Sequence, residues 1–294
     1  MTFNPNADIG GGKASKRGRN TGIAVGGGLG VVALFLLSQL LGVDLTGLVG
    51  GGGGGQPAAT DSSLEQCLTG ADANENVECR MKGASASLEA YWSQQGGPEI
   101  ELAYAGPRDL VLFDGAVNTG CGGASSATGP FYCPPDQTIY IDVTFYDELR
   151  SRFGSSGGPL AEMYVIAHEW GHHVQNIAGV LERSQDGQTG PTSNAVRVEL
   201  QADCFAGAWA ADASTVPDES GVPFLQEITP EQYTSAIDAA AAVGDDRIQE
   251  ATQGQVSPHT FTHGTSEQRV RWFETGFDQG AGACDTFAVD GSAL

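Results

Sequence analysis

The second half of the chain alternates between stretches with helical spacing and short polar loops. Apolar side chains recur every three or four residues over 160–174, 194–211 and 229–249, which would give each stretch one apolar face in a helix. Pro159 stands where the first residue of a helix is expected, and Thr229 begins a capping-box pattern for the third stretch. We therefore predict three helices joined by loops.

The first half has a different pattern. Residues 64–94 show helical spacing with a break near 72–74, whereas 102–118 and 138–145 are rich in β-branched and aromatic residues and predict strands. The Gly-rich stretch 120–133 between them predicts a loop or ribbon. We expect an α+β fold, mainly helical with a small β-sheet or ribbon, in one domain over 64–285 and a short tail over 286–294.

The first predicted helix contains the string H-E-x-x-H, with His168, Glu169 and His172 at its fixed positions. A helix turns about 100° per residue, so the two histidines share one face and can bind one Zn²⁺. Glu169 lies beside that face, where it can take a proton from metal-bound water. The alternative is a surface helix that carries a few histidines. His173 points off the shared face and is expected not to be a ligand, although a register that uses it stays open.

A catalytic zinc site usually has a third protein ligand. The second predicted helix offers Glu199 and Asp203, four residues apart on one face. Glu199 can reach the metal, and Asp203 can accept the other ring N–H of a ligating histidine, for which His168 is the candidate. The alternative is an ordinary amphipathic helix with two solvated acids.

The H-E-x-x-H string followed by E-x-x-x-D resembles the gluzincin class of zinc metallopeptidases. With the flanking residues 168–175, 199–204 and 262–269, the chain is similar to the bacterial neutral zinc metallopeptidase family over 65–285. The resemblance implies a zincin-like domain, a zinc peptidase activity and Glu199 as the third ligand. It also implies that an edge strand beside the metal helix binds the substrate backbone, with the ribbon 120–133 as its candidate and a surface hairpin as the alternative.

The same resemblance implies a late histidine that stabilises the oxyanion formed during hydrolysis, and His263 is the candidate. His263 precedes another helical stretch, for which Thr265 or Ser266 can serve as the N-cap. The alternative is a histidine that helps to cap this helix. His259 is less favoured, and a tyrosine such as Tyr233 stays open as the donor.

The N-terminus predicts a membrane location. Residues 1–20 carry four basic side chains and one acidic side chain, and the following run 21–43 has no charge and is long enough to span a bilayer. We expect 1–20 to be a cytoplasmic tail, 21–43 a single-pass transmembrane signal anchor, and 44–63 a Gly-rich linker. The catalytic domain would then be extracytoplasmic at the cell membrane. A cleaved signal peptide and a buried core helix are the alternatives.

All six cysteines lie beyond the uncharged run, and an even number in an exported domain suggests disulfides. Local spacing favours two short pairs, which leaves one long pair. These pairs are Cys67–Cys79, Cys121–Cys133 and Cys204–Cys284. Cysteine as a zinc ligand is the rival interpretation.

The formal net charge of the chain is −22, and Lys82 is the one lysine beyond residue 20. This composition argues against nucleic acid as a partner, because phosphate binding needs clustered cations. We therefore predict a membrane-anchored zinc metalloendopeptidase with one Zn²⁺ per chain and a protein or peptide substrate. The alternatives are a cell-wall peptide amidase that uses the same site and a zincin-like binding protein without turnover.

Overall fold

The computed structural model describes residues 2–17 and 64–294 of the chain. These residues form a mixed α+β fold in which helices predominate, as predicted. The helices are α2 (Gly70–Glu75), α3 (Val77–Tyr91), α4 (Gly97–Glu99), α5 (Phe145–Ser151), α6 (Pro159–Ile177), α7 (Asn194–Asp212), α8 (Pro230–Ala242), α9 (Asp245–Gln253) and α10 (Ser266–Gln279). A π-helical turn covers Trp92–Gly96, and 3-10 turns cover Ser126–Thr128, Leu181–Ser184, Pro258–Thr260, Ala281–Ala283 and Gly291–Ala293.

The strands form a four-stranded sheet and a separate hairpin. They are β1 (Ser15–Arg17), β2 (Asp109–Phe113), β3 (Ala116–Thr119), β4 (Gly122–Ser125), β5 (Phe131–Cys133) and β6 (Thr138–Asp142). The sheet order is β1-β2-β6-β5, in which β5 is antiparallel to β6 and the other neighbours are parallel. Strands β3 and β4 form the antiparallel hairpin.

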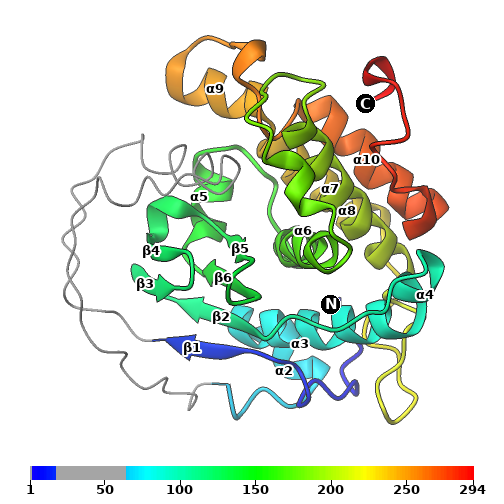
Figure 1. Ribbon diagram of the computed structural model, residues 1–294. Helices are drawn as coiled ribbons and strands as arrows, with labels where there is room; N and C mark the ends of the chain where they lie inside the picture. Colours follow the sequence, from blue (N-terminus) through cyan, green and yellow to red (C-terminus); the bar gives the residue numbers. More distant parts are fainter. Residues whose placement is uncertain (1, 18–63) are drawn as a thin grey trace.

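Helix α6 is the central element of the fold (Figure 1). It packs against β5 and β6 on the sheet side and against α3, α7 and α8 among the helices. Fifteen of its residues are buried, including Trp170 and Val174. A helix buried on nearly all sides places its polar residues among packed neighbours, so each of them needs a specific partner.

Two helices begin where the sequence predicts, and one predicted helix is divided in two. Pro159 starts α6, and Thr229 caps α8 with Gln232 as its capping-box partner. The expected single helix over 229–249 is instead two helices, α8 and α9. The break lies at Gly244, where a Cβ would lie 2.5 Å from the backbone nitrogen of Ser266. The close approach of α10 to this point therefore separates α8 from α9.

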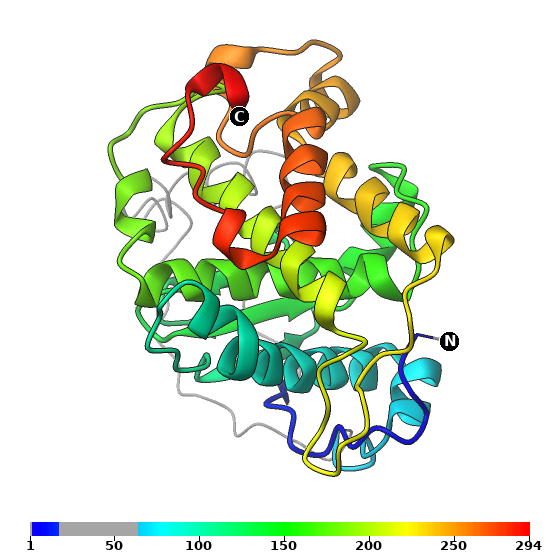
Figure 2. The same cartoon turned by 90° about the vertical axis from the view of Figure 1, so that its right-hand side faces the viewer.

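The N-terminal segment is part of the folded domain. Phe3 and Ile9 are fully buried, and the backbone N–H of Asp8 donates to Asp218 at 2.7 Å. Strand β1 extends the sheet beside β2. Figure 2 shows this segment, in blue, passing α2 and the loop that joins α7 to α8. The basic residues take part in the packing, since Lys16 forms an ion pair with Glu78 of α3 at 2.6 Å.

The predicted location at the membrane is therefore corrected. A cytoplasmic tail would lie across the bilayer from the catalytic domain, yet residues 2–17 pack into that domain. Within residues 2–17 and 64–294, no helix has both the length and the apolar character that a bilayer crossing requires. The expected anchor 21–43 and linker 44–63 lie outside the described residues.

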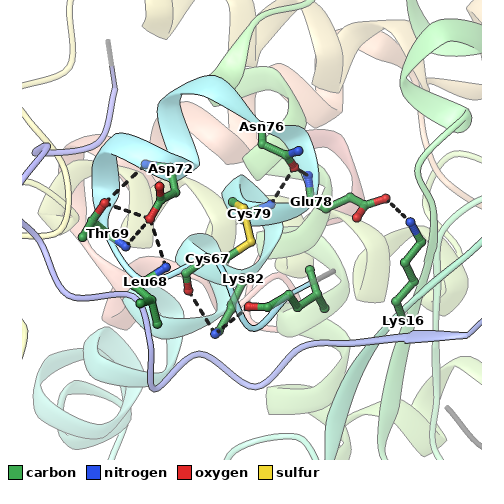
Figure 3. The surroundings of a disulfide bond; sticks show 10 residues. Lys16, Cys67, Leu68, Thr69, Asp72, Asn76, Glu78, Cys79 and Lys82 are labelled. Carbon is green, nitrogen blue, oxygen red and sulfur yellow. Dashed lines mark hydrogen bonds and ion pairs between the residues drawn. A yellow bond between two sulfur atoms is a disulfide. The ribbon is translucent and has the colours of Figure 1, made fainter. Parts of the chain in front are cut away.

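The six cysteines form three disulfides in the pairing that spacing favoured: Cys67–Cys79, Cys121–Cys133 and Cys204–Cys284. This pairing excludes cysteine as a zinc ligand. Near the first disulfide, the buried Lys82 ammonium donates to the carbonyl oxygens of Leu64 and Cys67 (Figure 3). Lys82 and the disulfide together fasten the segment before α2 to α3.

Helices α7 and α10 touch at the level of their backbones. A Cβ on Gly207 would lie 2.0 Å from the carbonyl oxygen of Phe273, and one on Gly276 would lie 1.8 Å from that of Cys204. The disulfide to Cys284 joins α7 to the segment after α10. This close contact fixes α10 relative to the acidic residues of α7. The C-terminal residues 286–294 also pack on the domain, and the Leu294 carbonyl accepts a hydrogen bond from Arg271 at 2.8 Å.

Candidate metal centre

A close crossing of α6 and α7 brings the predicted metal ligands together. Gly171 faces Ala202 at this crossing, where a Cβ on Gly171 would lie 3.0 Å from the Cα of Ala202. His172 follows this glycine, and Ala202 lies between Glu199 and Asp203. The absence of a side chain at residue 171 therefore lets the two ligand-bearing helices approach each other.

One ligand atom from each of His168, His172 and Glu199 lies within 4.8 Å of the others. The Nε2 atom of His168 is 3.2 Å from Glu199 Oε2, and the Nε2 atom of His172 is 3.5 Å from Glu199 Oε1. Two imidazole nitrogens and one carboxylate oxygen form a donor set that suits Zn²⁺ and leaves room for a fourth ligand. The residues present therefore fit the metal that the sequence predicts.

Asp203 lies behind His168, where the sequence places it. Its Oδ1 atom is 2.8 Å from His168 Nδ1, so the carboxylate can hold the Nδ1 proton and leave Nε2 for a metal. Asp203 is fully buried and is itself held by two other side chains. Arg269 donates to both of its oxygens, at 2.8 and 2.9 Å, and the Tyr164 hydroxyl donates to Oδ1 at 2.5 Å.

These neighbours decide the charge states of the cluster. Burial alone would raise the pKa of Glu199, but the charges of His172 and His263 outweigh it and hold that pKa far below its usual range. Burial likewise opposes ionisation of Asp203, but Arg269 and His168 lower its pKa. Both carboxylates are therefore ionised at neutral pH, as a metal ligand and a proton acceptor must be.

Glu169 lies beside the ligand set, as the helical spacing predicts. Its side chain is nearly buried, with 8% of the residue exposed. Burial raises the pKa of Glu169 above its ordinary value, although the charges of His172 and His168 and the backbone amide of Tyr132 in β5 act in the opposite direction. Glu169 is therefore influenced both by the ligand histidines and by the edge strand of the sheet.

The charge of His263 acts on the ligand set, because it lowers the pKa of Glu199. Asp245, at the start of α9, accepts the backbone N–H of His263 at 2.7 Å and lies 3.2 Å from its Nδ1. Burial would lower the pKa of His263, but Asp245 and Glu199 raise it. The N-cap of α10 is Thr265, so capping does not account for His263.

The other histidines and the candidate tyrosine have different surroundings. His173 contacts the Tyr132 hydroxyl through Nδ1 at 3.1 Å and the Ala105 carbonyl through Nε2 at 2.7 Å. It therefore holds α6 against the sheet region and does not join the ligand set. His259 is exposed in a 3-10 turn, and Tyr233 packs against the rings of Phe273 and Phe277.

Sequence reasoning missed the roles of Arg269, Tyr164 and Asp245. Tyr164 lies in α6 itself, one turn before His168, and Arg269 lies in α10, and both contact Asp203 of α7. The arginine at the end of the string 262–269, in a chain with 14 Lys and Arg residues, was the available signal. For Asp245, the acid in the first turn of α9 was visible, but its distance from His263 depends on the break at Gly244.

Comparison with known proteins gives a consistent set of matches. Residues 4–287 match the model of a family described as "Putative neutral zinc metallopeptidase". Uncharacterized proteins of Mycobacterium bovis and Mycobacterium tuberculosis strain H37Rv are each 49% identical over 260 residues, which cover 86% of this chain and 85% of theirs. The uncharacterized protein YpfJ of Escherichia coli K12 is 41% identical over 268 residues, which cover 89% of this chain and 86% of its own. No solved structure matches the chain.

Proposed function

Because the chain belongs to this family of neutral zinc metallopeptidases, we propose that it is a zinc metalloendopeptidase that hydrolyses peptide bonds in a protein or peptide substrate. The observation that carries the proposal is the convergence of His168, His172 and Glu199, with Glu169 beside them. The arrangement of the ligands on two crossing helices supports a zincin-like catalytic domain. The family match supports zinc over other divalent metals.

The ligand residues would hold one Zn²⁺ through two ring nitrogens and one carboxylate oxygen. When bound there, Zn²⁺ supplies a Lewis acid that polarises a peptide carbonyl and lowers the pKa of a water molecule to about 7. Glu169 accepts the proton of the attacking water and returns it to the leaving amine. Its position in α6, one residue after His168, keeps the Glu169 carboxylate beside the ligand set for both transfers.

His263 would donate a hydrogen bond to the oxyanion that forms on the substrate carbonyl. Its Nδ1 faces Asp245, which leaves Nε2 as the donor toward substrate. Asp245 also raises the pKa of His263 and so favours the protonated ring that can donate. Such a donor contributes about 3 kcal/mol to stabilisation of the transition state.

The experiment that tests the proposal joins metal content with cleavage of an unfolded protein. The full chain should contain one zinc and cleave the substrate. Glu169→Gln should retain zinc and lose activity by a factor on the order of 100 to 10,000, because it removes the proton acceptor but no ligand. Glu199→Ala should bind zinc more weakly.

The matched control is Glu182→Gln, which changes an exposed carboxylate outside the ligand set. This variant should cleave as the unmodified chain does. If Glu169→Gln cleaves as well as the control, the assignment of the proton acceptor is wrong. A chain with one zinc and no cleavage of any peptide would contradict the peptidase proposal itself.

A further inference from the structure

The two histidines of the ligand set are held by different kinds of partner. His168 faces the carboxylate of Asp203. His172 faces a neutral amide, since its Nδ1 atom is 2.9 Å from Oε1 of Gln175, three residues later on α6. Gln175 is fully buried, so its amide can be satisfied only by the groups packed around it.

We propose that Gln175 is a positioning residue of the metal centre, which fixes the tautomer and ring orientation of His172 so that Nε2 faces the metal position. The proposal concerns binding of the metal and rests on the metal site named in the proposed function. It assigns a role to a side chain that is neither a ligand nor a proton-transfer group.

The orientation of the Gln175 amide follows from its other neighbours. Its Nε2 atom lies 2.6 Å from the carbonyl oxygen of Val198, which can only accept a hydrogen bond. The NH₂ group must therefore face Val198, and the Oε1 atom must face His172. Because Oε1 can only accept, the proton of neutral His172 lies on Nδ1 and the Nε2 lone pair is free for a metal.

A second glutamine strengthens this orientation. The Gln175 NH₂ group also donates to Oε1 of Gln201 at 3.1 Å, and Gln201 Nε2 donates to the Cys284 carbonyl at 2.9 Å. The Cys284 carbonyl again can only accept. Two backbone carbonyls thus fix the direction of a hydrogen-bond relay that ends at His172. Because both amides are fixed in this way, Gln175 presents an acceptor and not a donor to Nδ1 of His172.

Gln175 also joins two of the three ligands. Val198, whose carbonyl it binds, directly precedes Glu199 in α7. The side chain therefore spans the gap between α6 and α7 and couples the position of His172 to that of Glu199.

The test measures zinc affinity of the full chain by competition with a chromogenic chelator. Gln175→Met keeps a side chain of similar length and removes both the acceptor and the donor. We expect its zinc affinity to fall by a factor on the order of 10 to 100, the effect typical of losing a partner of a ligand histidine. The d–d absorption spectrum of the Co²⁺ form should also change, because the ring of His172 is then free to turn.

A second variant separates positioning from packing. Gln175→Glu restores an acceptor for His172 but faces the Val198 carbonyl without a donor. We expect it to recover zinc affinity to within about tenfold of the unmodified chain while its melting temperature stays low. The matched control is Asn176→Leu, which removes a neighbouring amide of α6 that donates to the Tyr132 hydroxyl at 3.0 Å. Its zinc affinity should not change.

Two outcomes would overturn the proposal. The first is a Gln175→Met variant that melts earlier but binds zinc as tightly as the unmodified chain, which would make Gln175 a packing residue. The second is a Gln175→Glu variant that loses as much affinity as Gln175→Met. If the unmodified chain itself binds no zinc, the metal site of the proposed function fails, and that result is distinct from both.

Discussion

Arg269 and Asp203 form a two-point ion pair that is almost completely buried, with Arg269 3% exposed and Asp203 fully buried. The pair joins α10 to α7 directly behind His168. Buried ion pairs give little net stability relative to apolar packing, but the loss of one partner leaves an uncompensated charge. The pair therefore ties the geometry of the metal centre to the packing of α10.

Replacement of Arg269 with methionine should destabilise the fold and weaken zinc binding together. The Asp203 carboxylate would lose its two charged N–H donors while it stays buried, at a cost of about 3–5 kcal/mol. Urea denaturation and chelator competition measure the two effects. Arg271→Met is the matched control, because Arg271 lies two residues later, is 45% exposed and pairs with an exposed Glu267. This control should change stability by less than about 1 kcal/mol, and an equal loss in both variants would refute the role of the buried pair.

The Asp245–His263 pair makes a prediction about the pH profile. Asp245 and Glu199 raise the pKa of His263, so the ring keeps its proton to a higher pH than an ordinary histidine does and loses it as the pH rises through that raised pKa. Activity should therefore fall on the alkaline side. Asp245→Asn removes one negative charge, lowers the pKa of His263 and should move the alkaline limb of kcat/KM to lower pH. If the alkaline limb stays at the same pH in this variant, a group other than His263 sets it.

Replacement of His263 itself should lower kcat without loss of zinc. His263→Ala removes the oxyanion donor, for which a loss on the order of 100-fold to 1,000-fold is expected. His259→Ala is the matched control, since His259 is exposed in its 3-10 turn. Cleavage rates and zinc contents of both variants test this prediction. Full activity of His263→Ala would show that another residue donates to the oxyanion.

Gly171 should tolerate no side chain. Alanine is favoured over glycine inside a helix by about 1 kcal/mol, but its Cβ at residue 171 would lie 3.0 Å from Ala202 Cα and 3.1 Å from Ala202 Cβ. Overpacking of this kind costs about 1–3 kcal/mol, so Gly171→Ala should unfold at lower urea and bind zinc more weakly. Gly123→Ala, where the added Cβ meets one atom at 3.9 Å, should do neither. Unchanged zinc affinity in Gly171→Ala would mean that α6 and α7 can separate without effect on the ligands.

Acid should release the N-terminal segment before the rest of the fold. Burial would raise the pKa of Asp218, but the backbone N–H of Asp8 and other donors lower it to about 2. An Asp pKa below its ordinary value gives stability that is present above about pH 4 and is lost as the pH falls toward that lower value. Hydrogen exchange at residues 2–17 should therefore rise in this range. In Asp218→Asn it should already be fast at neutral pH, and slow exchange there would contradict the assignment.

The parts of the site that depend on local spacing were predictable from sequence. H-E-x-x-H on one helix and E-x-x-x-D on another define faces that a helix fixes by itself, and the structure brings His168, His172 and Glu199 together. The partners of these residues were not predictable in the same way. Gln175 was visible in the motif, but its contact with Val198 depends on how α6 crosses α7.

The start of the chain shows how a local signal can mislead. Basic residues before an uncharged run are typical of a membrane anchor, yet Lys13 and Lys16 pair with Glu89 and Glu78 of α3. Parallel pairing of β1 with β2 joins residues 15–17 to 111–113. Contacts between such distant segments leave no periodic trace in the sequence, so neither β1 nor the burial of Phe3 could be predicted.

The docking of the N-terminal segment also sets an order of events during synthesis. Residues 2–9 have early partners, such as Leu68 and Asn74, and late partners, such as Asp218 and Leu225. At roughly 5–20 residues per second, the late partners follow residues 2–9 by on the order of ten seconds or more. Phe3 and Ile9 can meet α3 sooner, since a Cβ on Gly83 would lie 2.8 Å from the Phe3 ring and 3.3 Å from Ile9. The N-terminal segment can therefore dock in two stages, first on α2 and α3 and later on the loop that joins α7 to α8.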